Sequence, residues 1–424
     1  MTNDAASAST VKMPVTLPVL DAMFADENFA GELKTKLQLS DEQIDKLKST
    51  ARQAVGNLRE ESGEGGSTRV AMERSGSQIR EIIGEEKAGK LFEMVSQRWN
   101  ADEAGDNSGG NNGGAAANNS SSKPNAIPTD TRVVVNAPAY RMDLFQDGKL
   151  TKSYKIGIGY PEFPLPTGVT RKANTIIFNP TWTTPDEPWV EASNKVKVGQ
   201  VVAAGDKLNP LGPIKIPIGS PSLIHGGKSP AKLGGFASHG CVGLTNTQVQ
   251  DFAMFIAKLS GTELMPEEVK NYAKQKTETK NFKLEKTVPV ELRYETIVVE
   301  NGKLRIFRDV YEKGTNTEEN LRAVLDSYGV SLDSLNEQKR KAILDGLKQM
   351  ALDATGSAAD GNSSEYAKQN TNQNANMKNA SNSKADASQG EKVTRGVKGK
   401  KEVSFDIAEL KGKGYPAPVN YSQS

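Results

Sequence analysis

Two tracts that are nearly free of apolar residues divide this chain and limit what can fold. Residues 104–125 are almost entirely Gly, Asn, Ala and Ser, and residues 354–400 are dominated by Asn, Ser, Gln, Ala and Lys. Such compositions cannot bury enough apolar area to offset the chain entropy that is lost on folding. The 424-residue chain is therefore expected to fold as separate units joined by disordered segments, and not as one compact body.

Composition and residue periodicity together predict the boundaries of these units. Ser40 followed by Gln43 is typical of a helix start, and apolar residues then recur at spacings of three and four. We expect a disordered N-terminus (1–16), a small α-helical module (17–100), a flexible linker (101–127), a β-rich domain (128–312), a helical hairpin (313–353), a disordered low-complexity segment (354–402) and a C-terminal docking segment or tail (403–424).

The β-rich domain is predicted from alternating and β-branched runs separated by turn residues. Asp147-Gly148 and Asn301-Gly302 are both typical of two-residue hairpin turns. Within this domain, only residues 246–259 have a convincing helical pattern. The expected fold class is α+β and multidomain, with mixed sheets and one main helix, flanked by small helical segments.

Charge and hydropathy exclude several classes of protein. The 54 Lys and Arg residues nearly balance the 52 Asp and Glu residues, so no overall positive field favours nucleic acid as a partner. No run approaches the ~18–20 apolar residues of a transmembrane helix, and no export signal is visible near the N-terminus. A single cysteine cannot form an intramolecular disulfide.

That cysteine lies close in sequence to both histidines of the chain. His225, His239 and Cys241 fall within seventeen consecutive residues, in a stretch rich in Gly, Ser and Lys. A thiol with a pKa of ~8.5 is mostly protonated at neutral pH, and an imidazole with a pKa of ~6.5 is well suited to take its proton. The cluster therefore predicts a cysteine nucleophile that attacks acyl groups.

The neighbours of the cysteine fit this chemistry. Glycine at position 240 lets a substrate carbonyl approach the backbone, and the N–H groups of Gly240 and Cys241 are expected to receive the developing oxyanion. The helix expected to begin at Asn246 would favour a thiolate if its N-terminus pointed at the sulfur.

Two alternatives assign the cluster no catalytic role. Cys241 could be an inert, small apolar residue of a core, with both histidines as structural polar groups. His225, His239 and Cys241 could also bind zinc, but this site would need a carboxylate or a water as its fourth ligand.

The residues around the cluster resemble the YkuD-type (ErfK/YbiS/YcfS/YnhG) L,D-transpeptidase catalytic domain. Its hallmark is a His-Gly followed, about a dozen residues later, by Ser-x-Gly-Cys, which His225-Gly226 and Ser238-His239-Gly240-Cys241 fit. The resemblance extends over residues 130–311 through several flanking blocks: Arg132 to Phe145, Gly157-Ile158-Gly159, Pro166-Thr167-Gly168, Asn179 to Pro185, and Asn209-Pro210-Leu211-Gly212.

The resemblance implies a peptidoglycan L,D-transpeptidase. In such enzymes, the cysteine attacks the bond after the L-centre of the diamino acid at position 3 of a donor tetrapeptide stem, and D-Ala is released. An amine of another stem, or a lysine of an envelope lipoprotein, then accepts the acyl group, which gives 3-3 cross-links or lipoprotein attachment. No cofactor or metal is needed, because the thioester keeps the bond energy. The resemblance also implies a role in cell wall organization and cell shape, and a location in the periplasm or cell wall.

The resemblance assigns a role to each matching residue. Cys241 is the expected nucleophile, His225 its general base, and Gly240 an oxyanion donor. The residues expected to contact the substrate are Ser238, His239, Gly226, Trp182 and Asn246, and Trp189 is a further candidate for the wall of a groove.

Two positions depart from the family pattern. Gly227 stands where the family often has Thr, and Gly243 stands where it usually has Arg. A guanidinium group is the usual partner of a substrate carboxylate, so its loss leaves carboxylate recognition unassigned. The candidates to replace this charge are Lys228, Lys232 and Arg171.

The same residues also fit two other functions. Hydrolysis of the thioester by water would make the protein an L,D-carboxypeptidase. A catalytically weak protein that binds wall material is the other possibility, and it is suggested by the missing arginine.

Overall fold

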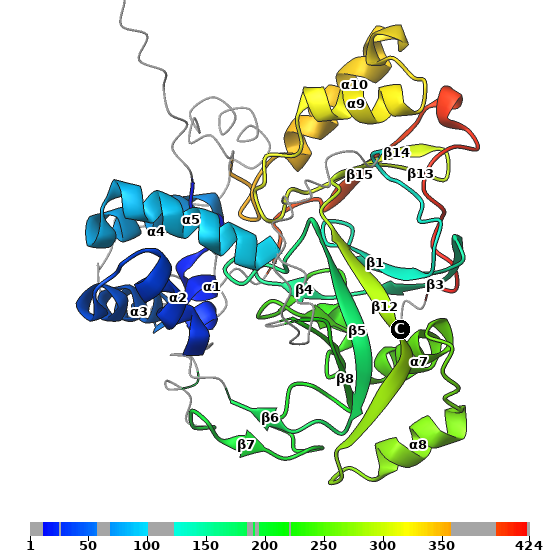
Figure 1. The fold of residues 1–424 in the computed structure, drawn as a ribbon. Coiled ribbons are helices and arrows are strands. Elements are labelled where there is room, and N and C mark those ends of the chain that lie inside the picture. The colour runs from blue at the N-terminus through cyan, green and yellow to red at the C-terminus, as the bar shows by residue number, and fades with distance from the viewer. Residues whose placement is uncertain are drawn as a thin grey trace, which may run out of the picture.

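The computed structural model describes residues 12–24, 27–56, 68–100, 123–184, 190, 195–219, 222–357 and 396–421. These residues form three units with separate hydrophobic cores: a helical N-terminal unit, a central unit built on a large sheet, and a C-terminal α/β unit (Figure 1). The α+β fold class expected from the sequence is confirmed. Most of the segments expected to be disordered, residues 1–11, 101–122 and 358–395, lie outside the described residues. In the described part of the chain, no helix combines the length and the apolar character needed to cross a bilayer.

The N-terminal unit consists of five helices around one apolar core: α1 (Leu17–Phe24), α2 (Glu27–Lys36), α3 (Asp41–Gly56), α4 (Thr68–Ile83) and α5 (Glu85–Asn100). Helix α3 begins at the predicted position. The Ser40 hydroxyl accepts a hydrogen bond from the Gln43 amide at 3.2 Å, and the Gln43 side chain accepts one from the Ser40 amide at 3.1 Å. This reciprocal pair satisfies two backbone donors that the first helical turn leaves free.

The residues just before α1 are buried, although composition placed them in the disordered N-terminus. Met13 and Val15 join the core of the helical unit. The Thr16 hydroxyl donates a buried hydrogen bond of 2.7 Å to the carbonyl oxygen of Glu162 in the central unit. These contacts between distant parts of the chain explain why composition alone did not predict their order.

The central unit is built on an eight-stranded sheet with the strand order β11-β9-β8-β5-β12-β1-β2-β3. Its strands are β1 (Arg132–Asn136), β2 (Arg141–Gln146), β3 (Lys149–Lys155), β5 (Val169–Phe178), β8 (Ile214–Pro217), β9 (Leu223–His225), β11 (Val242–Gly243) and β12 (Lys280–Arg293). Two smaller sheets pair β4 (Ile158–Gly159) with β10 (Phe236–Ser238), and β6 (Trp182–Thr183) with β7 (Val201–Val202).

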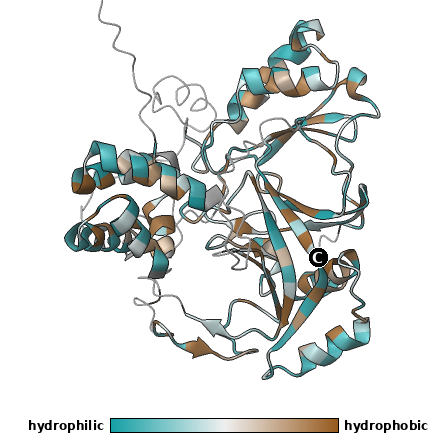
Figure 2. Ribbon diagram, in the orientation of Figure 1, coloured by the Kyte–Doolittle hydropathy of each residue, from teal (hydrophilic) through white to brown (hydrophobic). Residues whose placement is uncertain are grey.

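The sequence pattern explains this sheet. Asp147 and Gly148 have φ angles of 49° and 78°, as the predicted two-residue turn between β2 and β3 requires. Burial largely alternates along β5, and Figure 2 shows hydrophobic and hydrophilic residues in alternation on β5 and β12. Each of these strands therefore presents one face to the core.

Helix α7 (Asn246–Leu259) covers one face of the sheet and begins and ends as the sequence predicts. Thr245 and Gln248 form a capping box at its start. The Tyr154 hydroxyl donates a 2.9 Å hydrogen bond to Asp251, and the Tyr154 ring meets Phe252 edge-on at 5.8 Å. These contacts fix the helix against β3. A shorter helix, α8 (Pro266–Lys274), follows.

The C-terminal unit combines β13 (Ile297–Glu300), β14 (Lys303–Phe307) and β15 (Glu402–Asp406) with α9 (Glu318–Ser327) and α10 (Glu337–Met350). The sequence analysis counted residues 297–307 with the β-rich domain and residues 403–424 as a docking segment or tail. In the structure, β14 pairs with both β13 and β15, so these segments share one sheet.

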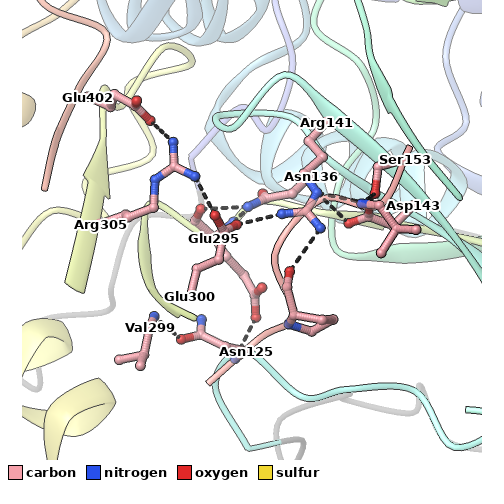
Figure 3. Close-up of polar contacts among 12 residues, drawn as sticks. Asn125, Asn136, Arg141, Asp143, Ser153, Glu295, Val299, Glu300, Arg305 and Glu402 are labelled. Atoms are coloured by element: carbon pink, nitrogen blue, oxygen red, sulfur yellow. Dashed lines mark hydrogen bonds and ion pairs between the residues drawn. The ribbon is translucent and has the colours of Figure 1, made fainter. Parts of the chain in front are cut away.

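A buried group of ion pairs joins the C-terminal unit to the central sheet (Figure 3). Arg141 of β2 contacts Asp143 at 2.8 Å and Glu300 of β13 at 2.5 Å. Arg305 bridges Glu300 and Glu402. The charges therefore link β2, the hairpin of β13 and β14, and β15, which are distant from one another in sequence.

The last described residues lie along the outer strand of the central sheet. The Ser153 amide on β3 donates a 2.9 Å hydrogen bond to the Val419 carbonyl oxygen, and the Val419 amide donates one of 3.1 Å to the Ser153 hydroxyl. Tyr415 packs edge-on against Phe145. The C-terminal segment thus covers part of the β3 edge.

Candidate active site

Two neighbouring strands at one edge of the central sheet carry the predicted nucleophile and base. Strands β9 and β11 are parallel, with Ile224 opposite Val242 and His225 opposite Gly243. Cys241 directly precedes β11. The register therefore brings Cys241 next to the strand that carries His225, offset from it by two positions along the chain.

His225 is held in one orientation by its own loop. The ring is buried, and its Nδ1 atom lies 2.7 Å from the Gly226 carbonyl oxygen. A carbonyl oxygen can only accept a hydrogen bond, so in the neutral ring Nδ1 carries the proton and Nε2 keeps its lone pair. Nε2 is therefore the atom that can accept a proton.

Burial keeps the His225 ring uncharged at neutral pH. Loss of hydration lowers its pKa from 6.5 to about 3, and the positive charges of Lys228 and Lys215 act in the same direction. Hydrogen bonding to the backbone at Gly226 and Leu211 opposes these effects without reversing them. The resting imidazole is thus neutral and carries no positive charge.

The Cys241 thiol is also buried and rests in its protonated form. Burial raises its pKa above the ordinary value, whereas a hydrogen bond from the Leu223 backbone and the charge of Lys228 act to lower it. The resting pair is therefore a neutral thiol and a neutral imidazole. Such a pair reacts when the proton moves to the ring as sulfur attacks.

Ser238 shapes the turn that presents Cys241. Its hydroxyl accepts a 3.0 Å hydrogen bond from the Cys241 amide and donates one of 2.6 Å to the Cys241 carbonyl oxygen. The Cys241 amide, expected to contact the oxyanion, is thus engaged within the turn in this structure. Ser238 contacts the backbone of Cys241, and its expected role in binding substrate stays a prediction.

Gly240 adopts the backbone conformation that the turn needs. Its φ angle is 86°, in the region that glycine adopts without strain. The Ser222 hydroxyl donates a 2.9 Å hydrogen bond to the Gly240 carbonyl oxygen, which fixes the direction of this peptide. No acceptor for the Gly240 amide is found among the described residues, so this N–H can serve an oxyanion.

Two aromatic rings enclose His239. Phe163 and Tyr160 meet its imidazole edge-on at centroid distances of 4.6 and 5.3 Å. The sequence analysis assigned His239 to the substrate but did not identify these rings. Both belong to residues 160–165, and Glu162 of this segment accepts the hydrogen bond from Thr16.

The loop after His225 is fixed by close contacts of Gly226, Gly227 and Asn246. The Asn246 side chain accepts a 2.7 Å hydrogen bond from the Gly227 amide. A Cβ at Gly226 would lie 2.8 Å from Val249, and Gly227 has a φ angle of 80° with no room for a Cβ. The glycine at 227, a departure from the family pattern, is therefore required by the backbone.

Trp182 lies on β6, which pairs with β7, and packs with Val190, Val196 and Val202. These four residues form a cluster separate from the main core. No contact in the described residues brings the Trp182 ring to Cys241, so its expected role in a substrate groove stays a prediction. Trp189 lies outside the described residues.

The alternative zinc site is not formed. Within the part of the chain that the structure describes, no three His, Cys, Asp or Glu side chains come together as a metal would require. The site residues that the sequence analysis missed are Ser222, Tyr160 and Phe163. The signal for the rings was present, since both follow Gly157-Ile158-Gly159 in a block typical of the family.

Comparison with known proteins assigns this part of the chain to a family. Residues 130–287 match the family model of the L,D-transpeptidase catalytic domain, YkuD. No curated protein sequence matches the chain. The family resemblance drawn from the sequence is thereby confirmed.

Several solved structures are similar to the chain at low identity. The catalytic domain of an Enterococcus faecium L,D-transpeptidase is 18% identical, with 31% of this chain and 92% of that chain covered and a TM-score of 0.24. L,D-transpeptidase 3 of Mycobacterium tuberculosis, in complex with a faropenem-derived adduct, is 14% identical. The match covers 38% of this chain and 60% of that chain, with a TM-score of 0.22. An L,D-transpeptidase of Mycobacterium smegmatis is 14% identical, with 38% of this chain and 58% of that chain covered and a TM-score of 0.19. At these scores the assignment rests on the family model.

Proposed function

Because residues 130–287 belong to the L,D-transpeptidase catalytic domain family, we propose that the chain transfers peptidoglycan acyl groups through Cys241, with His225 as its base. The observation that carries this proposal is the pairing of β9 with β11, which sets His225 opposite Gly243, two residues from Cys241. Nδ1 of His225 is held by the Gly226 carbonyl oxygen, which leaves Nε2 to take the thiol proton.

The reaction follows from these groups. As the thiol proton moves to Nε2 of His225, sulfur attacks the carbonyl carbon between the diamino acid and the terminal D-Ala of a tetrapeptide stem. The Gly240 amide stabilises the oxyanion of the tetrahedral intermediate. When the intermediate collapses, the C–N bond breaks, the D-Ala amine takes the proton from His225, and a thioester remains on Cys241.

An amine of the acceptor completes the transfer. It attacks the thioester carbon and gives a proton to His225, which returns it to the departing sulfur. A second stem as acceptor gives a 3-3 cross-link, and a lysine of an envelope lipoprotein gives an attached lipoprotein. We infer a location in the periplasm or cell wall, where the protein would contribute to cell wall organization and cell shape.

The nucleophile is tested by intact-mass analysis after incubation with a carbapenem. A mass increase equal to one carbapenem is expected for the wild type and not for Cys241→Ala. His225→Gln should form the same adduct much more slowly, by a factor of about 100 to 10,000, since general-base catalysis contributes about that much. Full adduct formation by Cys241→Ala would contradict the assignment of the nucleophile.

Product analysis with purified tetrapeptide stems identifies the acyl acceptor. Cross-linked dimers indicate transfer, and tripeptides alone indicate an L,D-carboxypeptidase that uses the same residues. If the stem is bound but neither product forms, the chain is a wall-binding protein and the proposed transfer is wrong.

A further inference from the structure

Gly243 is a glycine that its own backbone does not require. Its φ angle is not among the positive values found in this chain, so an ordinary L-residue could adopt its conformation. A side chain at position 243 is excluded because Lys228 already occupies the space. A Cβ at position 243 would lie 2.8 Å from Cγ, 3.1 Å from Cε and 3.4 Å from Cδ of Lys228. The lysine stem therefore fills the volume that a side chain at 243 would take.

The main chain holds Lys228 in this place. Its amide donates a 3.1 Å hydrogen bond to the Leu244 carbonyl oxygen, and the Leu244 amide donates one of 2.8 Å to the His225 carbonyl oxygen. Residues 225–228 thus run beside residues 242–244, which continue from Cys241. A lysine at 228 reaches across Gly243 because of this pairing.

Lys228 is the charged side chain that acts on the sulfur. Burial lowers the pKa of the Lys228 ammonium group, and attraction to a Cys241 thiolate acts to raise it. The Lys228 charge in turn acts to lower the pKa of the Cys241 thiol. His225 is neutral, and Lys215 acts on His225. Lys232, an exposed residue, acts on Lys228. In the described residues, no carboxylate forms an ion pair with Lys228.

The other candidate for the missing arginine lies elsewhere. Arg171 is buried on β5, two strands away from β9 in the sheet order, and its guanidinium group packs against Gly219. Of the three cations considered from the sequence, only Lys228 both occupies the space over position 243 and acts on Cys241.

We propose that Lys228 is the anion-recognition group of the Cys241 site, and that its ammonium group binds a carboxylate of the acyl donor across Gly243. Among the described residues this half-buried ammonium group has no carboxylate partner, so a bound carboxylate would offset the cost of its burial. The identity of the donor rests on the proposed function, whereas the presence of the charge beside the sulfur does not. Gly243 and Lys228 depend on each other, because any larger residue at 243 would displace the lysine.

Two alkylating reagents test the charge without any peptide. Iodoacetamide is neutral and iodoacetate is anionic, and both react with the same Cys241 thiolate, so the ratio of their rates reports the local charge independently of thiol ionisation. The ratio of iodoacetate to iodoacetamide rates is expected to fall about three- to tenfold in Lys228→Met. Lys228→Arg should keep the ratio. Lys232→Met is the matched control and should leave it unchanged.

Moving the positive charge from position 228 to position 243 tests whether these two positions share one space. Gly243→Arg alone brings two cations and a steric overlap together, so its melting temperature is expected to fall. The double variant Lys228→Ala with Gly243→Arg removes the overlap and should restore both the melting temperature and the rate ratio. If Lys228→Met does not fold, the salt dependence of the wild-type ratio replaces it, since added salt should lower that ratio.

The donor itself is tested with a tetrapeptide stem that ends in a free carboxylate and with the same stem as its carboxamide. The wild type should prefer the carboxylate, through KM, and Lys228→Met should lose this preference. An unchanged alkylation ratio in folded Lys228→Met would overturn the proposal. A changed ratio in a protein that transfers no acyl group would instead reject the proposed function and keep the anion site.

Discussion

The Thr16 hydroxyl and the Glu162 carbonyl oxygen form a buried 2.7 Å hydrogen bond between the helical N-terminal unit and the central unit. Glu162 lies between Tyr160 and Phe163, whose rings enclose His239, two residues from Cys241. The helical unit is therefore bonded to the segment that forms one wall beside the nucleophile turn.

Removal of this hydrogen bond should loosen residues 160–165. Thr16→Val keeps the side-chain shape but leaves the buried carbonyl without its donor, a loss of about 1–2 kcal/mol. Hydrogen exchange of the amides in this segment is expected to rise about 5- to 30-fold. Thr35→Val is the matched control, because the Thr35 hydroxyl is exposed and bonds only within its own helix. Equal exchange in both variants would contradict the coupling.

The fold of the central unit was largely accessible from the sequence, and local signals explain why. The alternation of β5, the Asp147-Gly148 turn and helix α7 each depend on neighbours within a few residues. The pairing of β14 with β15 could not be predicted, because nearly one hundred residues separate the strands. No local pattern specifies such a partner.

The candidate site was likewise predictable from the sequence only in part. The Cys-His cluster and its glycines predict a nucleophile and a base by residue type and spacing. The space over Gly243 depends on how β9, β11 and Lys228 pack, and sequence alone could not choose among Lys228, Lys232 and Arg171. Residue identity thus suffices to propose the chemistry, whereas the placement of side chains required the fold.

The ion pairs between the central and C-terminal units predict that replacing Arg141 with an uncharged residue strongly destabilises the fold. Arg141→Met leaves the buried carboxylates of Asp143 and Glu300 without this partner, so the free energy of unfolding should fall by about 3–5 kcal/mol. Denaturant unfolding measures the change. Lys303→Met is the control, because its pair with Asp406 is exposed and should contribute less than about 1 kcal/mol. Similar losses in the two variants would contradict the role of burial.

The low pKa of His225 predicts a specific dependence of stability on pH. The unfolded ring takes up a proton near its ordinary pKa of 6.5, whereas the folded ring does so only near 3. The stability that depends on the neutral ring is therefore complete above pH 6.5 and is lost as the pH falls from about 6.5 to about 3. The loss should approach about 1.4 kcal/mol for each pH unit within that range.

His225→Gln isolates this contribution. The difference in free energy of unfolding between the wild type and the variant should increase with pH up to about 6.5 and then stay constant. Parallel stability curves for the two proteins between pH 4 and 6 would show that the folded ring titrates normally.

The close approach at Gly159 predicts a local effect on the nucleophile turn. A Cβ there would lie 2.1 Å from the Phe163 carbonyl oxygen and 3.0 Å from the Gly240 amide nitrogen. Gly159→Ala must shift the backbone, so carbapenem acylation of Cys241 should slow at least about tenfold, with a loss of about 1–3 kcal/mol in stability. Gly235→Ala is the matched control, since the atom nearest to a Cβ at position 235 would be Nζ of Lys401, at 3.6 Å. If the two variants reacted at the same rate, the turn would not depend on this contact.

The contact between Val419 and Ser153 has a consequence for self-association. Strand β3 is the last strand of the eight-stranded sheet, and an outer strand offers unpaired amides and carbonyls to any passing chain. By bonding to Ser153, the C-terminal segment occupies that template from within the same molecule. The C-terminal segment is therefore expected to hinder pairing of another chain with β3 at Ser153.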